Sequence, residues 1–238
     1  MTDGLLTSFE AAALWLSVKV AFWAVGLSLP LAFTVAYILA RGQFYGHGIL
    51  NAVVHLPLVL PPVVVGYGLL LLFARGGPVG SWLQENFDVS LAFTWQAAAI
   101  ASAVMAFPLM VRAIRMSIEA IEPGLEAAAR TLGASAWRIY LTVILPLSLP
   151  GILTGTVLGF ARSLGEFGAT ITFAANIPGQ TQTLPLALFS VAESPGNEVA
   201  AARLAIIGVV LALAALLASE VLAQRLARRL GRQERYSP

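Results

Sequence analysis

The stretch EAIEPGLEAAARTLGASAWRIYLTVILPLSLP, residues 119–150, is the longest run of high charge density before the C-terminal tail. Apolar segments flank it on both sides. The hydrocarbon core of a membrane offers no hydrogen-bond partners to charged groups or irregular backbone, so such a run has to lie in water between two membrane spans. The stretch therefore predicts an integral membrane protein with a large polar loop at this point.

The composition of the chain also favours a membrane protein. Of its 238 residues, 58% are hydrophobic and 11% are charged, whereas a typical soluble domain has roughly 25% charged residues. The net charge of +2 comes from a few arginine clusters and does not indicate a nucleic-acid surface. With no cysteine and two histidines, the sequence excludes disulfides and thiolate metal sites and predicts neither a metal site nor a cofactor.

Runs of about 20 apolar residues, the length that crosses a bilayer, occur about five times. The expected spans are 14–40, 49–74, 91–110, 145–168 and 203–222. We expect the first to be a retained span, because acidic residues precede it and no small-residue cleavage site follows it. The sequence thus predicts an all-α integral membrane protein that forms a single transmembrane domain over residues 1–238.

The arginines set the expected orientation. They gather in the tail, residues 223–238, and in and just before the loop 117–144, whereas the segments 75–90 and 174–198 hold more acidic than basic residues. Segments rich in arginine stay in the cytoplasm. We therefore expect a cytoplasmic loop and tail and an outside N-terminus, which requires an odd number of spans.

Several residues interrupt the apolar runs. Lys19, near the start of the first span, is expected to reach the lipid headgroups rather than to serve an ion pathway. His55 is expected to be hydrogen-bonded within its helix rather than to bind substrate. Pro57, Pro61 and Pro62 predict that the second span kinks or breaks near them.

The loop 117–144 has the signals of two short helices. Pro123 suits the first turn of a helix that runs to Leu132, and Gly133 is placed to end it. Within this helix, Glu126 and Arg130 have the i, i+4 spacing of an ion pair. A face suited to docking in a groove is formed by Leu125, Ala128, Ala129 and Leu132. A second helix is expected to begin at Ala136, with Ser135 as its cap.

This order of helix, glycine, helix and Leu-Pro step resembles the cytoplasmic signature of ABC importer permeases, in which EAA is followed by three residues, glycine, nine residues and I-x-L-P. Gly133, the nine residues 134–142 and the segment 143–146, VILP, fit that pattern, with valine in place of isoleucine. Counting back from Gly133 places alanines at all three EAA positions, so Glu126 stands one residue early. On a helix this displaces the side chain by about 100°.

The resemblance implies the fold of a type I ABC importer permease, whose short cytoplasmic helix docks into a cleft of the ATPase subunit. The residues that it assigns to ATPase coupling are Glu126, Ala127, Ala128, Ala129, Arg130, Leu132, Gly133, Leu145 and Pro146. ATP hydrolysis is expected on the partner subunit, because this sequence has no glycine-rich phosphate loop with lysine and serine or threonine. The chain itself is therefore expected not to be an enzyme.

The segment 152–190, ILTGTVLGFARSLGEFGATITFAANIPGQTQTLPLALFS, resembles molybdate importer permeases, and so does HLPLVLPPVVVGYGLLLLF in the second span. Sulfate and thiosulfate permeases share the F-A-R and G-E-F-G core. The segments 169–173, ATITF, and 176–179, NIPG, followed by Thr-Leu-Pro at 183–185, favour molybdate. Tungstate, sulfate and thiosulfate are the alternative cargoes.

The fourth expected span carries the candidate path residues. Gly151, Gly155 and Gly159 form a smooth stripe, which favours close packing of another helix over a role in lining the path. Arg162 and Glu166 are expected to pair, because an isolated charge within a membrane is costly. The candidate translocation-path residues are Arg162, Ser163, Glu166, Thr170 and Thr172. For the hydroxyl groups, bonding to the backbone of their own helix is the alternative to substrate contact.

The resemblance implies a multi-pass protein of the bacterial inner membrane that functions as a homodimer. Its expected partners are a second copy, two ABC ATPase subunits, a periplasmic molybdate-binding protein at segments 75–90 and 174–198, and membrane lipid, with no nucleic acid. Two functions of other classes are the alternatives. An intramembrane enzyme is disfavoured because the polar residues of the spans supply no nucleophile and base pair, and a channel would need no ATPase.

Overall fold

The computed structural model describes residues 6–234, with side chains to residue 218 and at Val221, and every regular element in that range is a helix. The helices are α1 (Ser8–Arg41), α2 (His47–Val59), α3 (Pro62–Phe73), α4 (Pro78–Phe87), α5 (Trp95–Glu119), α6 (Pro123–Thr131), α7 (Ala136–Ile139), a π-helical turn (Tyr140–Ile144), α8 (Leu145–Leu147), α9 (Leu149–Leu164), α10 (Gly168–Phe173), α11 (Leu184–Ala192) and α12 (Glu198–Glu234). The predicted all-α class is confirmed. The arginine side chains of the tail lie outside the described residues.

Three helical stretches of the described residues are long and apolar enough to cross a membrane, namely α1, α5 and residues 198–218 of α12. Two further candidates are bent pairs: α2 with α3, at 113°, and the segment 136–147 with α9, at 67°. If each bent pair is one span, the total is five. These stretches correspond in order to the five predicted spans.

Both bends occur at prolines. Helix α2 ends at Val59, and α3 begins at Pro62 with Pro61 as its N-cap residue. Two consecutive prolines have no backbone N–H to donate to the preceding turn, so the hydrogen-bond ladder stops there. The predicted kink of the second span is therefore a full break. The second bend is at Ser148, just before α9, in which Pro150 occupies the first turn.

Helix α5 extends beyond the predicted end of the third span. The sequence suggested an end near residue 110, before Arg112 and Arg115, but the helix continues to Glu119. Arg115 pairs with Glu119 at 2.7 Å and donates to the Asn51 side chain at 3.1 Å. Arg115 and Glu119 neutralise each other on the surface of α5. The helix can therefore continue through this charged segment.

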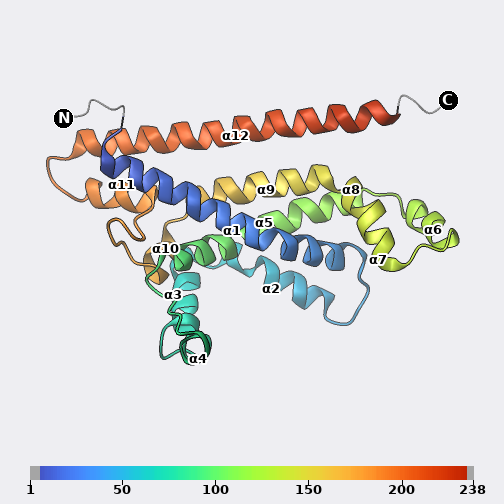
Figure 1. The fold of residues 1–238 in the computed structure, drawn as a ribbon, viewed down its shortest axis with the longest axis horizontal. Coiled ribbons are helices and arrows are strands. Elements are labelled where there is room, and N and C mark those ends of the chain that lie inside the picture. The colour runs from blue at the N-terminus through green and yellow to red at the C-terminus, as the bar shows by residue number, and fades with distance from the viewer. Residues whose placement is uncertain (1–5, 235–238) are drawn as a thin grey trace.

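The centre of the molecule is a bundle of α1, α5 and α9, which run side by side along its longest axis (Figure 1). Small residues line the contact between α1 and α5. Both helices bury many alanines: Ala21, Ala24, Ala32 and Ala36 on α1, and Ala97, Ala98, Ala101 and Ala106 on α5. Small side chains let two backbones approach closely, which strengthens packing where lipid provides no hydrophobic drive between helices.

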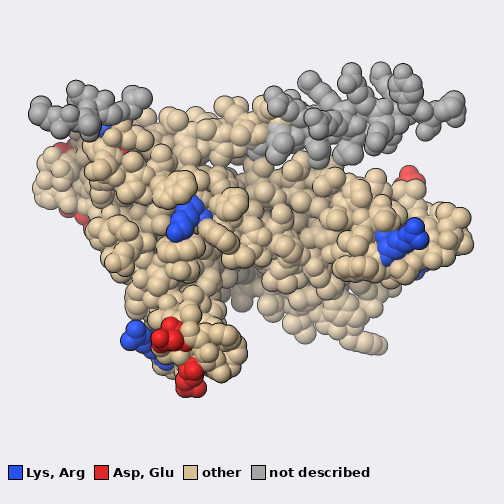
Figure 2. Space-filling model, viewed as in Figure 1, with Lys and Arg blue, Asp and Glu red and all other residues tan. Residues whose placement is uncertain are grey.

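The bundle has two distinct ends. Helices α6 and α7 lie at one end, and α10 and α11 lie at the other, where α3 and α4 project to the side (Figure 1). We call these the α6 end and the α11 end. On the face seen in Figure 2, charged side chains gather mainly near the extremities of the molecule, and most of the surface between them is uncharged. This distribution suits a bundle that crosses a membrane along its long axis.

Candidate functional site

Helix α6 forms a short arm at the α6 end. Pro123 occupies its first turn, as predicted, and its last residue is Thr131, one before the predicted Leu132. Gly133 then adopts φ +82°, its N–H donates to the Arg130 carbonyl at 2.9 Å, and the Ala134 N–H donates to the Ala129 carbonyl at 3.0 Å. These two bonds make a Schellman motif, the helix end that favours glycine at the left-handed position.

The chain after Gly133 is anchored to the bundle through α7. Ser135 caps this helix by accepting from the Arg138 N–H at 3.3 Å, as predicted. Tyr140 contacts three aromatic rings, with centroid distances of 5.3 Å to Trp137, 5.1 Å to Phe33 and 5.0 Å to Tyr37. Because Phe33 and Tyr37 belong to α1, the π-helical turn that follows α7 packs against the first helix.

The Leu-Pro step of the signature follows a widened helical turn. Residues 140–144 form a π-helix, in which the Leu145 N–H bonds to the Tyr140 carbonyl, and Leu145 and Pro146 begin α8. A proline ring crowds the carbonyl four residues before it in a regular α-helix. The wider turn before Pro146 relieves this crowding and lets the chain continue into the bend at Ser148.

Glu126 has a different partner from the predicted one. Its Oε1 accepts from Arg41 Nε at 2.8 Å, and Arg41 also donates through Nη2 to the Ile121 carbonyl at 2.9 Å. The Glu126 side chain is 10% exposed, whereas Arg130, one helical turn later, is exposed and takes part in none of the four ion pairs found among the described residues. The predicted pairing of Glu126 with Arg130 is therefore wrong, because the carboxylate faces the bundle and meets the C-terminal residue of α1.

The ion pair with Arg41 leaves the rest of α6 free to present a surface. Leu125 is 48% exposed, Leu132 is 88% exposed, and Trp137 on α7 is 68% exposed. Ala127 and Ala128 are exposed as well, whereas Ala129 is half-buried and packs against the core. Of the residues predicted to form a docking face, Leu125, Ala128 and Leu132 are thus exposed and Ala129 is not, and Trp137 adds to the exposed apolar surface.

At the end of α9, the predicted ion pair forms. Arg162 Nη1 lies 2.6 Å from Glu166 Oε2, and the Glu166 side chain is only 1% exposed. Its other oxygen, Oε1, accepts from the Ala169 N–H at 2.8 Å, at the start of α10. Glu166 therefore holds both Arg162 and the first turn of α10, which is a structural role.

The three hydroxyl groups among the candidate path residues differ in their bonding. Thr172 donates to the Gly168 carbonyl at 2.9 Å, within its own helix. Ser163 and Thr170 are buried, and within the described part of the chain their hydroxyl oxygens have no hydrogen-bond partner. Bonding to the backbone of its own helix thus accounts for Thr172. The O–H donors of Ser163 and Thr170 are not used within the described part of the chain.

Lys19 and His55 are polar residues of the expected spans with defined contacts. His55 Nδ1 lies 2.8 Å from the Asn51 carbonyl oxygen, which confirms the prediction of a bond within its own helix. Lys19 contacts an aromatic ring of another helix. Its ammonium group lies 3.7 Å from the centroid of the Trp95 ring on α5, a cation–π contact.

Sequence reasoning missed the role of Arg41. The sequence assigned no contact to Arg41, and 85 residues separate it from Glu126. No local spacing rule connects residues so far apart. The one signal in the sequence was indirect: Glu126 stands one residue out of step with the coupling signature.

Comparison with known proteins finds relatives that are all components of transport systems. A family model described as "Binding-protein-dependent transport system inner membrane component" matches residues 28–232. The molybdenum transport system permease protein ModB of Haemophilus influenzae is 55% identical over 93% of this chain and 97% of its own length. The sulfate transport system permease protein CysT of Escherichia coli is 41% identical over 65% of this chain and 56% of its own length.

The fold also matches a solved structure. A chain of the methionine ABC transporter MetNI, in inward-facing conformations, superposes with a TM-score of 0.74 at 17% identity, over 95% of this chain and 99% of that one. Identity at this level supports the fold alone. The family match over residues 28–232 and the 55% identity to ModB show that the chain belongs to the family of inner-membrane components of binding-protein-dependent transport systems, the permease subunits of ABC importers.

Proposed function

We propose that this chain is the permease subunit of an ATP-driven importer for molybdate. The observation that supports this cargo is the 55% identity to a molybdenum permease over 93% of the chain, against 41% over a shorter stretch to a sulfate permease. Tungstate and sulfate or thiosulfate are the alternative cargoes. Two copies would form the path between them in the bacterial inner membrane.

The geometry of the α6 end supports coupling to an ATPase. An exposed apolar arm, α6, is held to α1 by Arg41 and to α7 through Gly133. A partner that binds Leu125, Leu132 and Trp137 would transmit its movement to both α1 and α7. In this proposal the α6 end is cytoplasmic, two ATPase subunits dock there, and a periplasmic binding protein delivers the anion to segments 75–90 and 174–198 at the other end.

The proposed path includes the end of α9. Arg162 is 28% exposed and partly neutralised by Glu166, so it would attract a dianion without holding it tightly, as a transport path requires. Ser163 and Thr170 would supply hydroxyl donors, and Glu166 and Thr172 would shape the site. The arrangement fits weak and transient contact with an oxyanion.

Uptake by the reconstituted complex tests the cargo. Proteoliposomes that contain this chain, its ATPase and its binding protein are expected to accumulate labelled molybdate only when ATP is supplied. Unlabelled molybdate should compete more strongly than sulfate. Transport of sulfate but not molybdate would contradict the cargo, and uptake without ATP would favour a channel.

Replacement of Gly133 by valine is expected to reduce ATP-driven uptake at least tenfold while ATP hydrolysis continues. A β-branched residue at φ +82° costs on the order of 1–2 kcal/mol or more, so the turn that links α6 to α7 would change shape. The ratio of molybdate transported to ATP hydrolysed measures the effect.

Two control variants accompany Gly133→Val. Gly133→Asn should retain most uptake, because asparagine tolerates the left-handed conformation. Gly124→Val places the same side chain in the first turn of α6, where a Cβ meets no atom within 4 Å. Normal uptake by Gly133→Val would refute the role of this turn.

A further inference from the structure

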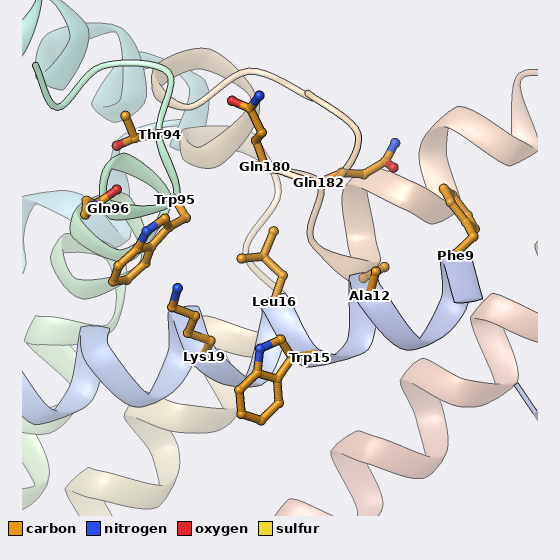
Figure 3. A pocket seen from close by; sticks show the side chains of 12 residues that line it. Phe9, Ala12, Trp15, Leu16, Lys19, Thr94, Trp95, Gln96, Gln180 and Gln182 are labelled. Carbon is orange, nitrogen blue, oxygen red and sulfur yellow. The ribbon is translucent and has the colours of Figure 1, made fainter. Parts of the chain in front are cut away.

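A cavity of about 470 Å³ lies near the α11 end, between α1, the first turn of α5 and the segment 179–182. Figure 3 shows its main side chains, with Lys19 extending from α1 toward the Trp95 ring and with Gln180 and Gln182 on the loop opposite α1. The volume is several times the roughly 30 Å³ that one water molecule occupies in the liquid. A small solute can therefore enter together with some of its water.

Lys19 gives this cavity a positive charge that the surrounding residues do not neutralise. The residues that line the cavity include no aspartate or glutamate. Among the described residues, the four ion pairs involve arginines, and the interaction found for Lys19 is its contact with the face of Trp95. A contact with an aromatic ring satisfies one direction of the ammonium group and leaves N–H donors for another ligand.

Neutral donors complete the cavity. The side chains of Gln96 and Gln180 are exposed and make no hydrogen bond within the described part of the chain. Gln182 is buried and donates one N–H to Ser190 Oγ at 3.4 Å, which leaves its second N–H free. The Thr94 hydroxyl is occupied, because it donates to the Leu91 carbonyl and accepts from the Ala97 N–H.

The cavity is lined by one ammonium group, three amide side chains and no carboxylate, a composition that suits an anion. We propose that this cavity binds a tetrahedral oxyanion at Lys19, either free in solution or as the phosphate of a lipid headgroup. An oxyanion has acceptor oxygens in several directions, which suits amide donors that come from α5 and from the loop. The proposal concerns the chain alone and does not depend on which cargo the importer carries.

Two features of the surroundings correspond to the two sources of oxyanion. Trp15 and Trp23 are 70% and 43% exposed on α1, four residues before and after Lys19, and exposed tryptophans are typical of the headgroup level of a membrane. Gln180 lies in an exposed loop, residues 178–180, that a free ion can approach from water. The experiment therefore includes one probe for each source.

The purified full-length chain, freed of lipid in detergent, is titrated by calorimetry with sodium molybdate and separately with dihexanoyl phosphatidylglycerol. We expect saturable binding of at least one probe, weakened about tenfold or more by Lys19→Gln and kept within about threefold by Lys19→Arg, since the charge is essential. Arg112→Gln, which removes an exposed cation on α5 outside the cavity, should bind as the unmodified chain does. The probe that binds identifies the source.

A second variant guards against misfolding of Lys19→Gln. Gln180→Glu places a negative charge on an exposed loop residue and should weaken binding about tenfold by repulsion, without disturbing the helices. Saturation with neither probe, or binding by Lys19→Gln or Gln180→Glu equal to that of the unmodified chain, would overturn the proposal. Binding of molybdate or of the lipid with the expected response to both variants would support it.

Discussion

Replacing Arg41 by methionine is expected to reduce ATP-driven uptake at least tenfold, although Arg41 lies outside the exposed docking surface of α6. The change leaves the Glu126 carboxylate, 10% exposed, without its charged partner. Loss of one partner of a fully buried pair costs about 3–5 kcal/mol. Because Arg41 is 21% exposed, solvent reduces this cost, and we expect about 1–3 kcal/mol in the stability of the α6 end.

A double-mutant cycle measures the pair directly. Glu126→Met alone should weaken uptake in the same way as Arg41→Met, whereas the double variant should lose less than the sum of the two. The reason is that two apolar side chains of similar volume replace a buried ion pair at little cost. A coupling free energy of about 1–3 kcal/mol is expected from thermal unfolding of the purified chain.

Arg130→Met is the matched control for the Arg41 prediction. Arg130 lies on the same helix, four residues after Glu126, but its side chain is exposed and forms no ion pair with Glu126. Its replacement should change stability by no more than about 0.5 kcal/mol. Strict additivity of the Arg41 and Glu126 changes, or an equal coupling of Glu126 to Arg130, would show that the contact between α1 and α6 has no mechanical role.

Replacing Gly151 by leucine is expected to prevent recovery of folded protein. A Cβ at this position would overlap the Ser117 side chain and lie 2.8 Å from the Ala113 carbonyl oxygen on α5. Backbone atoms of a packed helix cannot move aside without separating α9 from α5. Overpacking of a core costs about 1–3 kcal/mol per site, and a rigid backbone contact lies at or above the upper end of that range.

The yield of monodisperse protein after detergent extraction measures this effect. Gly26→Leu provides the control, because Gly26 is exposed on α1 and a Cβ there meets no atom within 4 Å. We expect the control to be recovered in normal amounts and to unfold at an unchanged or higher temperature, since leucine favours a helix more than glycine does. Equal recovery of the two variants would contradict the packing role of the α9 glycines.

Much of the fold could be predicted because its signals are local. The prolines at 61 and 62 remove backbone donors wherever the chain goes, so the break between α2 and α3 follows from the residues themselves. Gly133 ends α6 through its left-handed conformation, and Ser135 caps α7 through its side chain. Both effects are equally local. The Arg162–Glu166 pair was also predictable, because its members are one helical turn apart.

The candidate sites were predictable only in part, because their decisive contacts join distant segments. The glycine stripe on α9 indicated close packing, and only the structure shows that α5 is its partner. Arg130 has the right spacing to pair with Glu126. In the structure, however, α6 packs on the bundle so that the Glu126 carboxylate meets Arg41 instead. The contact of Lys19 with Trp95 likewise joins α1 to the start of α5, and no local pattern in the sequence predicts it.

The sequence by itself determined the class of the protein, the positions of its helix breaks and the glycine-terminated arm of the coupling loop. These depend on hydropathy, on missing backbone donors and on helix-end chemistry, all of which act within a few residues. Only the tertiary structure decided that α6 is held to α1 through Arg41 and that a positive cavity forms around Lys19. Both depend on how three helices pack against one another, and packing depends on residues far apart in the chain.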